Sequence, residues 1–224
     1  MKQLIIFDCD GVLIDSEYLA NKVFIDVLFN YGYSISMEES IKKFTGLHEH
    51  ACREIIMKEA QRDIPQDYWA LAQPKLLKTF ELELTPLLNP LLEMLDKLKI
   101  PRCVASNSSY HYVTQSLGFT ETLKYFNKNA IFTAELVSKP KPAPDLFLLA
   151  AKNMGISPEN CIVIEDSLAG AQAAIDAGMK VMMFLGGSHA RFNWYKDRFV
   201  LHDLPTFPSC EELLNAIQSH ILKN

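Results

Sequence analysis

The stretch QLIIFDCDGVLIDSE, residues 3–17, joins a short apolar run to a group of acids. Residues 3–8 read as a buried strand, because the apolar run at residues 4–7 is continuous, as in strands covered on both faces. The run ends at Asp8, and Asp10 follows two residues later. Burying a carboxylate is unfavourable unless a partner offsets its charge. The stretch therefore predicts a central strand that holds an acidic site at its carboxyl end.

The composition is that of an ordinary globular protein, with 224 residues, 49% hydrophobic and 22% charged residues and a net charge of −5. A mildly acidic chain has no overall field that attracts nucleic acid or an anionic membrane, so we expect neither as a partner. No apolar stretch approaches the ~18 residues of a membrane span, and the N-terminal run is too short for a signal peptide. The five cysteines are scattered without a C-x-x-C pair. This pattern is typical of reduced thiols and predicts a cytoplasmic protein. We expect a monomer, with an oligomer as the alternative.

A long helical segment follows the first strand. Ser36 and Glu39 form a capping-box pattern within it, and Pro74 is expected to kink or split its last helix. The periodicity predicts an all-helical cap domain over residues 16–84.

From about residue 85 the pattern alternates between helices and short apolar runs rich in β-formers. Strands are expected at residues 102–107, 130–135, 161–166 and 181–186. Such alternation predicts a parallel sheet with helices on both faces. The expected fold class is therefore α/β: a doubly wound, Rossmann-like core formed by residues 1–15 and 85–224, with the helical cap inserted.

Polar residues follow each of the first four predicted strands, where open parallel sheets bind their ligands. These residues are Asp8, Ser106-Asn107, Lys139 with Lys141, and Glu165-Asp166. Carboxylates gathered at one edge repel each other unless a cation lies among them, and oxygen-only ligands suit Mg²⁺. Ser106 and Lys141 would supply a donor and a positive charge for a phosphate.

The two aspartates of the first strand are expected to have different roles. Asp8 ends the strand and is rigidly held, which suits a nucleophile and metal ligand that forms an aspartyl-phosphate. Asp10 lies beyond the strand end and can protonate a leaving alkoxide and later deprotonate a water. Gly11 allows the chain to turn sharply beside the phosphate.

Two other polar stretches are set apart from the site. Asp15 and Glu17 lie at the entry to the cap, where a hinge and a helix N-terminus account for them. GGSH, residues 186–189, is interpreted as a flexible surface turn, with a loop near the mouth of the site as the alternative.

Together these residues resemble the motifs of the haloacid dehalogenase-like superfamily. In order along the chain, the matching stretches are DCDGV (8–12), SN (106–107), KPAPD (141–145) and EDSLAG (165–170). Within the superfamily the chain is most similar to β-phosphoglucomutase-like enzymes and sugar-phosphate phosphatases with a helical cap. The cap is then expected to close over the site and select a small phosphorylated substrate.

The resemblance implies a role for each matching residue. Asp8 would be the nucleophile and a Mg²⁺ ligand, and Asp10 the general acid/base with its carbonyl as a ligand. Ser106 and Lys141 would bind the transferring phosphate. The remaining assignments are a phosphate or substrate contact for Asn107, a metal ligand for Asp166, and a place in or next to the metal shell for Glu165.

The resemblance leaves hydrolysis and phosphoryl transfer to sugar as alternatives. Similar mutases carry an arginine in the cap that grips a second phosphate, but this chain has Glu49 near that position and its nearest arginine, Arg53, a turn later. A carboxylate there would repel a second phosphate, whereas His48 and His50 could replace the arginine if protonated. We therefore predict a phosphatase, with a phosphomutase and a phospho-acceptor switch as the alternatives.

Overall fold

The computed structural model describes residues 3–45, 49–61, 64–65, 67–200 and 202–222. The chain separates into two compact units, one formed by Met1–Asp15 and Thr85–Asn224 and the other by Ser16–Leu84. Each unit has its own buried core and is described by itself.

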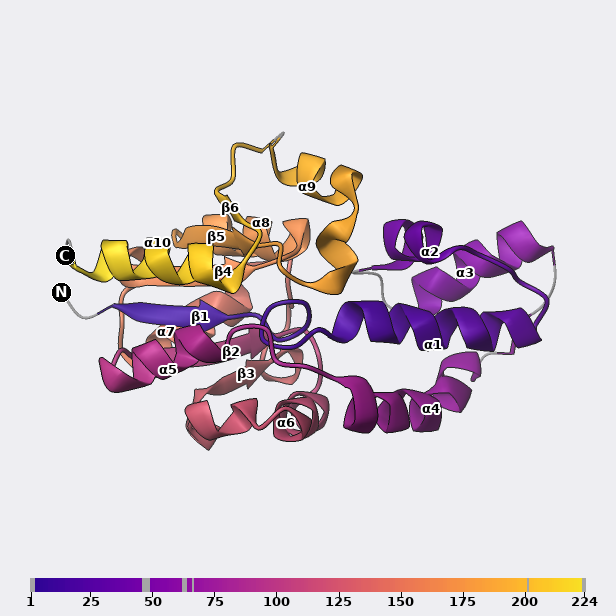
Figure 1. The fold of residues 1–224 in the computed structure, drawn as a ribbon, viewed down its shortest axis with the longest axis horizontal. Coiled ribbons are helices and arrows are strands. Elements are labelled where there is room, and N and C mark those ends of the chain that lie inside the picture. Colours follow the sequence, from indigo (N-terminus) through magenta and orange to yellow (C-terminus); the bar gives the residue numbers. More distant parts are fainter. Residues whose placement is uncertain (1–2, 46–48, 62–63, 66, 201, 223–224) are drawn as a thin grey trace. The chain divides into compact units, whose positions relative to one another are not determined.

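The first unit is built on a six-stranded parallel sheet with the order β3-β2-β1-β4-β5-β6 (Figure 1). The strands are β1 (Leu4–Phe7), β2 (Arg102–Ser106), β3 (Ile131–Thr133), β4 (Cys161–Glu165), β5 (Lys180–Phe184) and β6 (Thr206–Phe207). The strand order reverses direction on either side of β1, as in a doubly wound sheet. The α/β fold class expected from the sequence is thus confirmed.

Helices cover the sheet on both faces. They are α5 (Asn89–Lys97), α6 (Tyr110–Phe119), α7 (Asp145–Met154), α8 (Leu168–Asp176) and α10 (Cys210–Leu222), whereas α9 (Asn193–Val200) packs beside the turn Ser188–Arg191. Short 3-10 turns lie at Thr122–Tyr125, Lys128–Ala130, Ala134–Leu136, Pro158–Asn160 and Ser188–Arg191. α5 packs beside α10, and α7 packs beside α8 on the opposite face. Covered faces explain why the strands read as continuous apolar runs.

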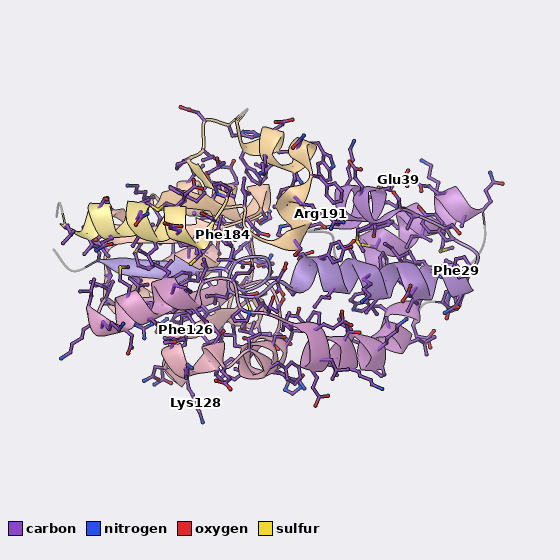
Figure 2. The ribbon with its side chains drawn as sticks, viewed as in Figure 1. Phe29, Glu39, Phe126, Lys128, Phe184 and Arg191 are labelled. Atoms are coloured by element: carbon purple, nitrogen blue, oxygen red, sulfur yellow. The ribbon has the colours of Figure 1, made fainter. Side chains whose placement is uncertain are left out.

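β1 lies at the centre of the sheet and fixes the position of Asp8. All four side chains of the strand are fully buried. The ring of Phe7 meets that of Phe126, which is labelled in Figure 2, edge to face with centroids 6.1 Å apart. Phe7 pairs with Ile164 of β4, and the amide of Asp8 donates to the Ile164 carbonyl at 3.0 Å. Burying each such apolar side chain contributes about 1.5–3 kcal/mol, so the strand end is firmly held.

The second unit consists of helices. They are α1 (Ser16–Asn30), α2 (Met37–Phe44), α3 (Glu49–Ala60) and α4 (Tyr68–Glu83). Phe24 lies in its core, with its ring 5.2 Å from Phe44 and 6.0 Å from Tyr68. The capping box of Ser36 and Glu39 is present at the start of α2, as predicted.

Two details differ from the sequence-based expectations. α4 runs through Pro74 as one helix, so the proline does not split it, and the buried stripe of Tyr68, Ala72, Leu76 and Phe80 continues on both sides. The sheet also has a sixth strand, β6, which is only two residues long and left no pattern.

The structure does not describe three of the cap side chains that bear on binding of a second phosphate. His48 lies outside the described residues, and the side chains of Glu49 and His50 are likewise not described.

Among the described helices, none is both long and apolar enough to serve as a membrane span.

Candidate active site

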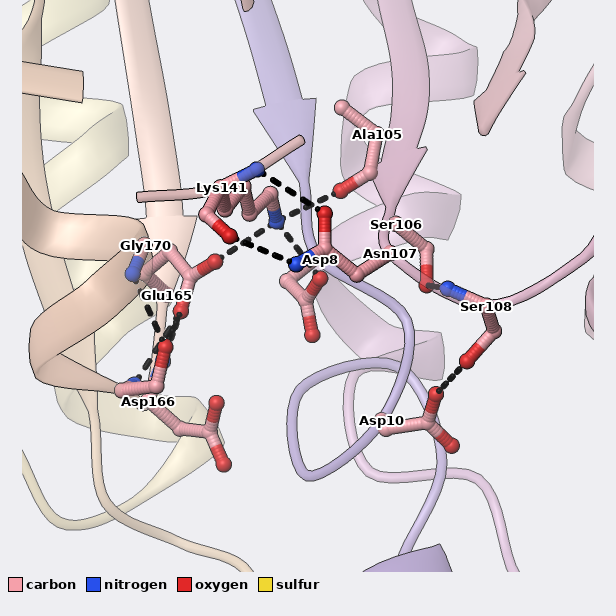
Figure 3. A network of polar contacts seen from close by, with 11 residues as sticks. Asp8, Asp10, Ala105, Ser106, Asn107, Ser108, Lys141, Glu165, Asp166 and Gly170 are labelled. Carbon is pink, nitrogen blue, oxygen red and sulfur yellow. Dashed lines mark hydrogen bonds and ion pairs between the residues drawn. The ribbon is translucent and has the colours of Figure 1, made fainter. Parts of the chain in front are cut away.

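The carboxyl ends of β1, β2 and β4 bring polar residues together at one edge of the sheet (Figure 3). Asp8 follows β1, Ser106 is the last residue of β2, and Glu165 is the last residue of β4. Lys141 reaches the same place from the loop between β3 and α7. The arrangement agrees with the rule that parallel sheets gather their strand ends at one edge.

Lys141 joins the groups of this edge. Its Nζ lies 2.7 Å from Asp8 Oδ1 and 2.7 Å from Glu165 Oε1, and it donates to the Ala105 carbonyl at 2.7 Å. The ammonium also lies over the ring of Phe147, 4.7 Å from its centroid. The residue is only 7% exposed, so a surface role for this lysine is excluded.

Asn107 holds the main chain of Lys141. Its Nδ2 donates to the Lys141 carbonyl at 3.0 Å, and its Oδ1 accepts from the Lys141 amide at 3.1 Å. Both polar groups of this side chain therefore face the lysine backbone. A contact between Asn107 and phosphate stays a prediction, whereas its contact with Lys141 is direct.

Burial dominates the electrostatics of the site. Burial raises the pKa of Asp8 well above the ordinary aspartate range; the Lys141 charge opposes this shift, and Glu165, Asp166 and Asp10 add to it. Burial also raises the pKa of Asp166, with further repulsion from Glu165 and Asp10. The carboxylates therefore carry more negative charge than Lys141 alone offsets.

Burial alone would lower the pKa of Lys141. The neighbouring carboxylates of Asp8 and Glu165 outweigh that effect and raise its pKa above the usual lysine value. Lys141 is therefore a permanently charged ammonium between two acids. Such a cation is suited to binding an anionic group beside Asp8.

Asp8, Glu165 and Asp166 form a group that fits a divalent cation. Each offers a carboxylate oxygen, and these oxygens lie within 4.8 Å of one another. Glu165 and Asp166 are buried, and the Asp8 side chain is 13% exposed. Carboxylate oxygens are ligands that Mg²⁺ commonly takes in proteins.

Glu165 has additional partners within the protein. Its Oε1 pairs with Lys141, while its Oε2 accepts from the amides of Asp166 and Ser167, each at 3.0 Å. The Ser167 hydroxyl donates to the same Oε2 at 2.9 Å. Among the three acids, Glu165 is thus the one most fully held by protein donors.

Asp10 is held by two hydroxyl groups that sequence reasoning missed. Tyr112 donates to its Oδ1 at 2.8 Å, and Ser108 donates to its Oδ2 at 2.9 Å. The Ser108 amide in turn donates to Ser106 Oγ at 3.1 Å. Tyr112 lies on α6, and only the path of that helix brings it to Asp10, so no local pattern could have revealed it.

Gly11 allows the loop after β1 to approach Asp166. Its φ of +73° lies in the left-handed region, as expected for a sharp turn. A Cβ here would also lie 2.0 Å from Asp166 Oδ2. Two independent constraints therefore require glycine at this position.

GGSH, residues 186–189, is not a flexible surface turn, and that interpretation was wrong. His189 is fully buried, and its Nε2 lies 2.9 Å from Asp166 Oδ2. Ser188 binds the carboxylate of Asp15 through its amide at 2.9 Å and through its hydroxyl. Asp15 thus holds a loop of the first unit, a function that its place in the sequence did not suggest.

The sequence is similar to those of known phosphatases and related hydrolases. The sequence profile of the haloacid dehalogenase-like hydrolases matches residues 5–184. The 6-phosphogluconate phosphatase of Escherichia coli strain K12 is 31% identical over 194 residues, which cover 84% of each chain.

Two solved structures extend the likeness to the whole chain. A conserved haloacid dehalogenase-like protein from Agrobacterium tumefaciens strain C58 is 32% identical with a TM-score of 0.86, covering 99% of this chain and all of that one. A HAD family hydrolase from Deinococcus radiodurans R1, with bound phosphate and sodium, is 26% identical with a TM-score of 0.81, covering 97% and 96%. The chain therefore belongs to the haloacid dehalogenase-like hydrolase family and is an enzyme of that family.

Proposed function

We propose that the enzyme is a Mg²⁺-dependent phosphatase that hydrolyses a small phosphorylated metabolite, of the sugar-phosphate class, through an aspartyl-phosphate. The observation that carries the proposal is the buried group of Asp8, Lys141 and Asp166, in which a strand-end carboxylate lies against a permanent cation. The similarity to a phosphatase of 6-phosphogluconate supports the choice of substrate class.

In the first half-reaction, an oxygen of Asp8 attacks phosphorus and the bond from phosphorus to the leaving oxygen breaks. Asp10 gives its proton to that oxygen, so the product leaves as a neutral alcohol. Lys141 and Ser106 bind the oxygens of the transferring phosphoryl group. Asp8 now carries the phosphoryl group as a mixed anhydride.

In the second half-reaction, Asp10 accepts a proton from a water molecule that attacks the aspartyl-phosphate. The bond between phosphorus and Asp8 breaks, which releases inorganic phosphate and restores both aspartates. Ser108 and Tyr112 hold Asp10 beside Ser106 between these steps.

Asp8 and Asp166, with the main-chain carbonyl of Asp10, are proposed to hold the Mg²⁺. The bound ion would neutralise phosphate charge and offset the repulsion among the carboxylates. Because protein donors already surround Glu165, we propose that it supports the site chiefly by holding Lys141. The unit Ser16–Leu84 is proposed to select the substrate.

The guanidinium of Arg53 favours hydrolysis over phosphoryl transfer to sugar. Its Nε and Nη2 donate to the Ile64 carbonyl at 2.8 and 2.5 Å, so this arginine has a structural contact inside its own unit. An enzyme that grips a second phosphate needs an arginine directed at that phosphate. A coupled assay for glucose 6-phosphate formed from β-glucose 1-phosphate tests the mutase alternative directly.

The proposal is tested by phosphate release from a panel of phosphorylated metabolites, including 6-phosphogluconate, with wild type and Asp8→Asn. Wild type should turn over many times with Mg²⁺ on a sugar phosphate, which also excludes a phospho-acceptor switch. Asp8→Asn should be inactive on every compound. Phosphate release that persists in Asp8→Asn would contradict the assignment of the nucleophile.

A further inference from the structure

The loop after β5 forms a buried contact with the acidic site. It runs from Gly186 to Ala190, between Phe184 and Arg191, which are labelled in Figure 2. Within it, His189 is fully buried and places Nε2 2.9 Å from Asp166 Oδ2. The mechanism proposed above gives this histidine no part.

Close packing fixes the imidazole of His189. A Cβ on Gly187 would lie 2.8 Å from both Cε1 and Nδ1 of the ring, and a Cβ on Gly11 would lie 2.8 Å from Cε1. The Tyr195 ring meets it edge to face, with centroids 4.9 Å apart and planes at 88°. The ring is therefore held from three sides with its Nε2 directed at Asp166.

The neighbouring residue anchors the loop. The amide of Ser188 donates to Asp15 Oδ1 at 2.9 Å, and its hydroxyl donates to Asp15 Oδ2. Gly11 and His189 thus both lie against Oδ2 of Asp166, and Asp15 binds the loop that carries His189.

We propose that His189 is a positioning residue for the metal site: it fixes the orientation of the Asp166 carboxylate, and Asp15 fixes His189 through Ser188. The inference rests on the proposed function, because it takes Asp166 as a metal ligand. Ligating carboxylates are usually oriented by outer partners, and losing such a partner typically weakens metal binding by about 10–100-fold.

The experiment measures Mn²⁺ binding by electron paramagnetic resonance, without substrate, in a matched pair of variants. His189→Gln keeps an amide N–H near the place of Nε2, whereas His189→Asn places its amide near Nδ1 and cannot reach Asp166. We expect His189→Asn to bind Mn²⁺ about 10–100-fold more weakly than wild type, and His189→Gln to retain most of the affinity. Equal, wild-type affinity in both variants would overturn the inference.

Two further variants separate the possible failures. His202→Leu, at an exposed position, should bind Mn²⁺ as wild type does. Asp166→Asn should lose most of the affinity; if it does not, the metal role of Asp166 itself is wrong. If Asp166→Asn loses affinity while His189→Asn does not, only the role of His189 is wrong.

Ser188→Ala removes the hydroxyl that binds Asp15 and leaves His189 in place, so it tests the anchor even if the histidine variants fold poorly. A several-fold weaker Mn²⁺ affinity is expected. Unchanged affinity in a folded Ser188→Ala would show that the hydroxyl contact to Asp15 does not fix His189.

Discussion

Lys141 Nζ lies 2.7 Å from Asp8 Oδ1 and is bound at the same time by Glu165 and the Ala105 carbonyl. This position gives the lysine two effects, which two different measurements can follow separately. It balances buried carboxylates in the folded protein, and it presents a cation beside the proposed nucleophile.

Replacing Lys141 with methionine should therefore damage both activity and stability. Removing one member of a buried ion pair leaves uncompensated charge and typically costs about 3–5 kcal/mol. We also expect kcat/KM to fall by about 100-fold or more, because a preorganised phosphate donor is lost. Thermal unfolding and phosphate release measure the two effects.

Lys139→Met is the matched control for this substitution. Lys139 is exposed and only two residues away, so its loss should change neither the melting temperature nor the rate appreciably. Equal effects of the two substitutions would contradict the assignment of Lys141.

Asp10→Asn should separate the two half-reactions. A p-nitrophenolate leaves without a proton, so the variant should still transfer phosphate to Asp8 from p-nitrophenyl phosphate. It cannot deprotonate the attacking water efficiently, so the phosphoenzyme should accumulate. A rapid-quench experiment should show a burst of one p-nitrophenol per enzyme and slow turnover after it.

An alkyl phosphate such as glycerol phosphate gives the contrasting result. Its alkoxide needs a proton in order to leave, so Asp10→Asn should form little phosphoenzyme from it. Equal phosphoenzyme from both substrates would mean that Asp10 is not the acid.

The raised pKa of Asp166 predicts that the stability of the metal-free protein depends on pH. Burial, with repulsion from Glu165 and Asp10, raises its folded pKa above the unfolded value. Its contribution to stability is thus fully present below the unfolded pKa and is lost as the pH rises through the folded pKa. Without metal, the protein should become less stable as the pH rises through this window.

Asp166→Asn removes the carboxylate and keeps the shape of the side chain. In EDTA at neutral pH it should melt a few degrees above wild type, since each kcal/mol corresponds to about 2–4 °C for a chain of this size. With saturating Mg²⁺ the order should reverse, because only wild type binds the ion well. Melting curves with EDTA and with Mg²⁺ at several pH values check both statements, and a variant less stable than wild type in EDTA would contradict the first.

The strand ends were predictable from sequence, whereas the contacts made by loops and helices were not. Asp8, Ser106 and Glu165 follow apolar runs, and parallel strands bring such positions to one edge whatever the connections are. Tyr112 and His189 reach the site only through the course of α6 and of the loop after β5. Local patterns do not encode these paths.

The flexible turn predicted for GGSH, residues 186–189, was wrong because of its two glycines. Gly186 and Gly187 suggested flexibility, but a Cβ on Gly186 would lie 2.4 Å from the Phe184 ring, and one on Gly187 would lie 2.8 Å from His189. These glycines are needed for close packing. A sequence does not distinguish glycine that permits motion from glycine that permits close approach.

Gly170 offers a direct test of close approach. A Cβ there would lie 1.8 Å from Glu165 Oε1, the oxygen that binds Lys141. Gly170→Ala should therefore displace Glu165 and disturb Lys141, lowering both the melting temperature and kcat. Gly118 is the matched control, because it too lies inside a helix but a Cβ would meet nothing within 4 Å. Gly118→Ala should stabilise the protein by about 0.5–1 kcal/mol and leave kcat unchanged. A Gly170→Ala variant that behaves like Gly118→Ala would mean that Glu165 does not hold Lys141 in place.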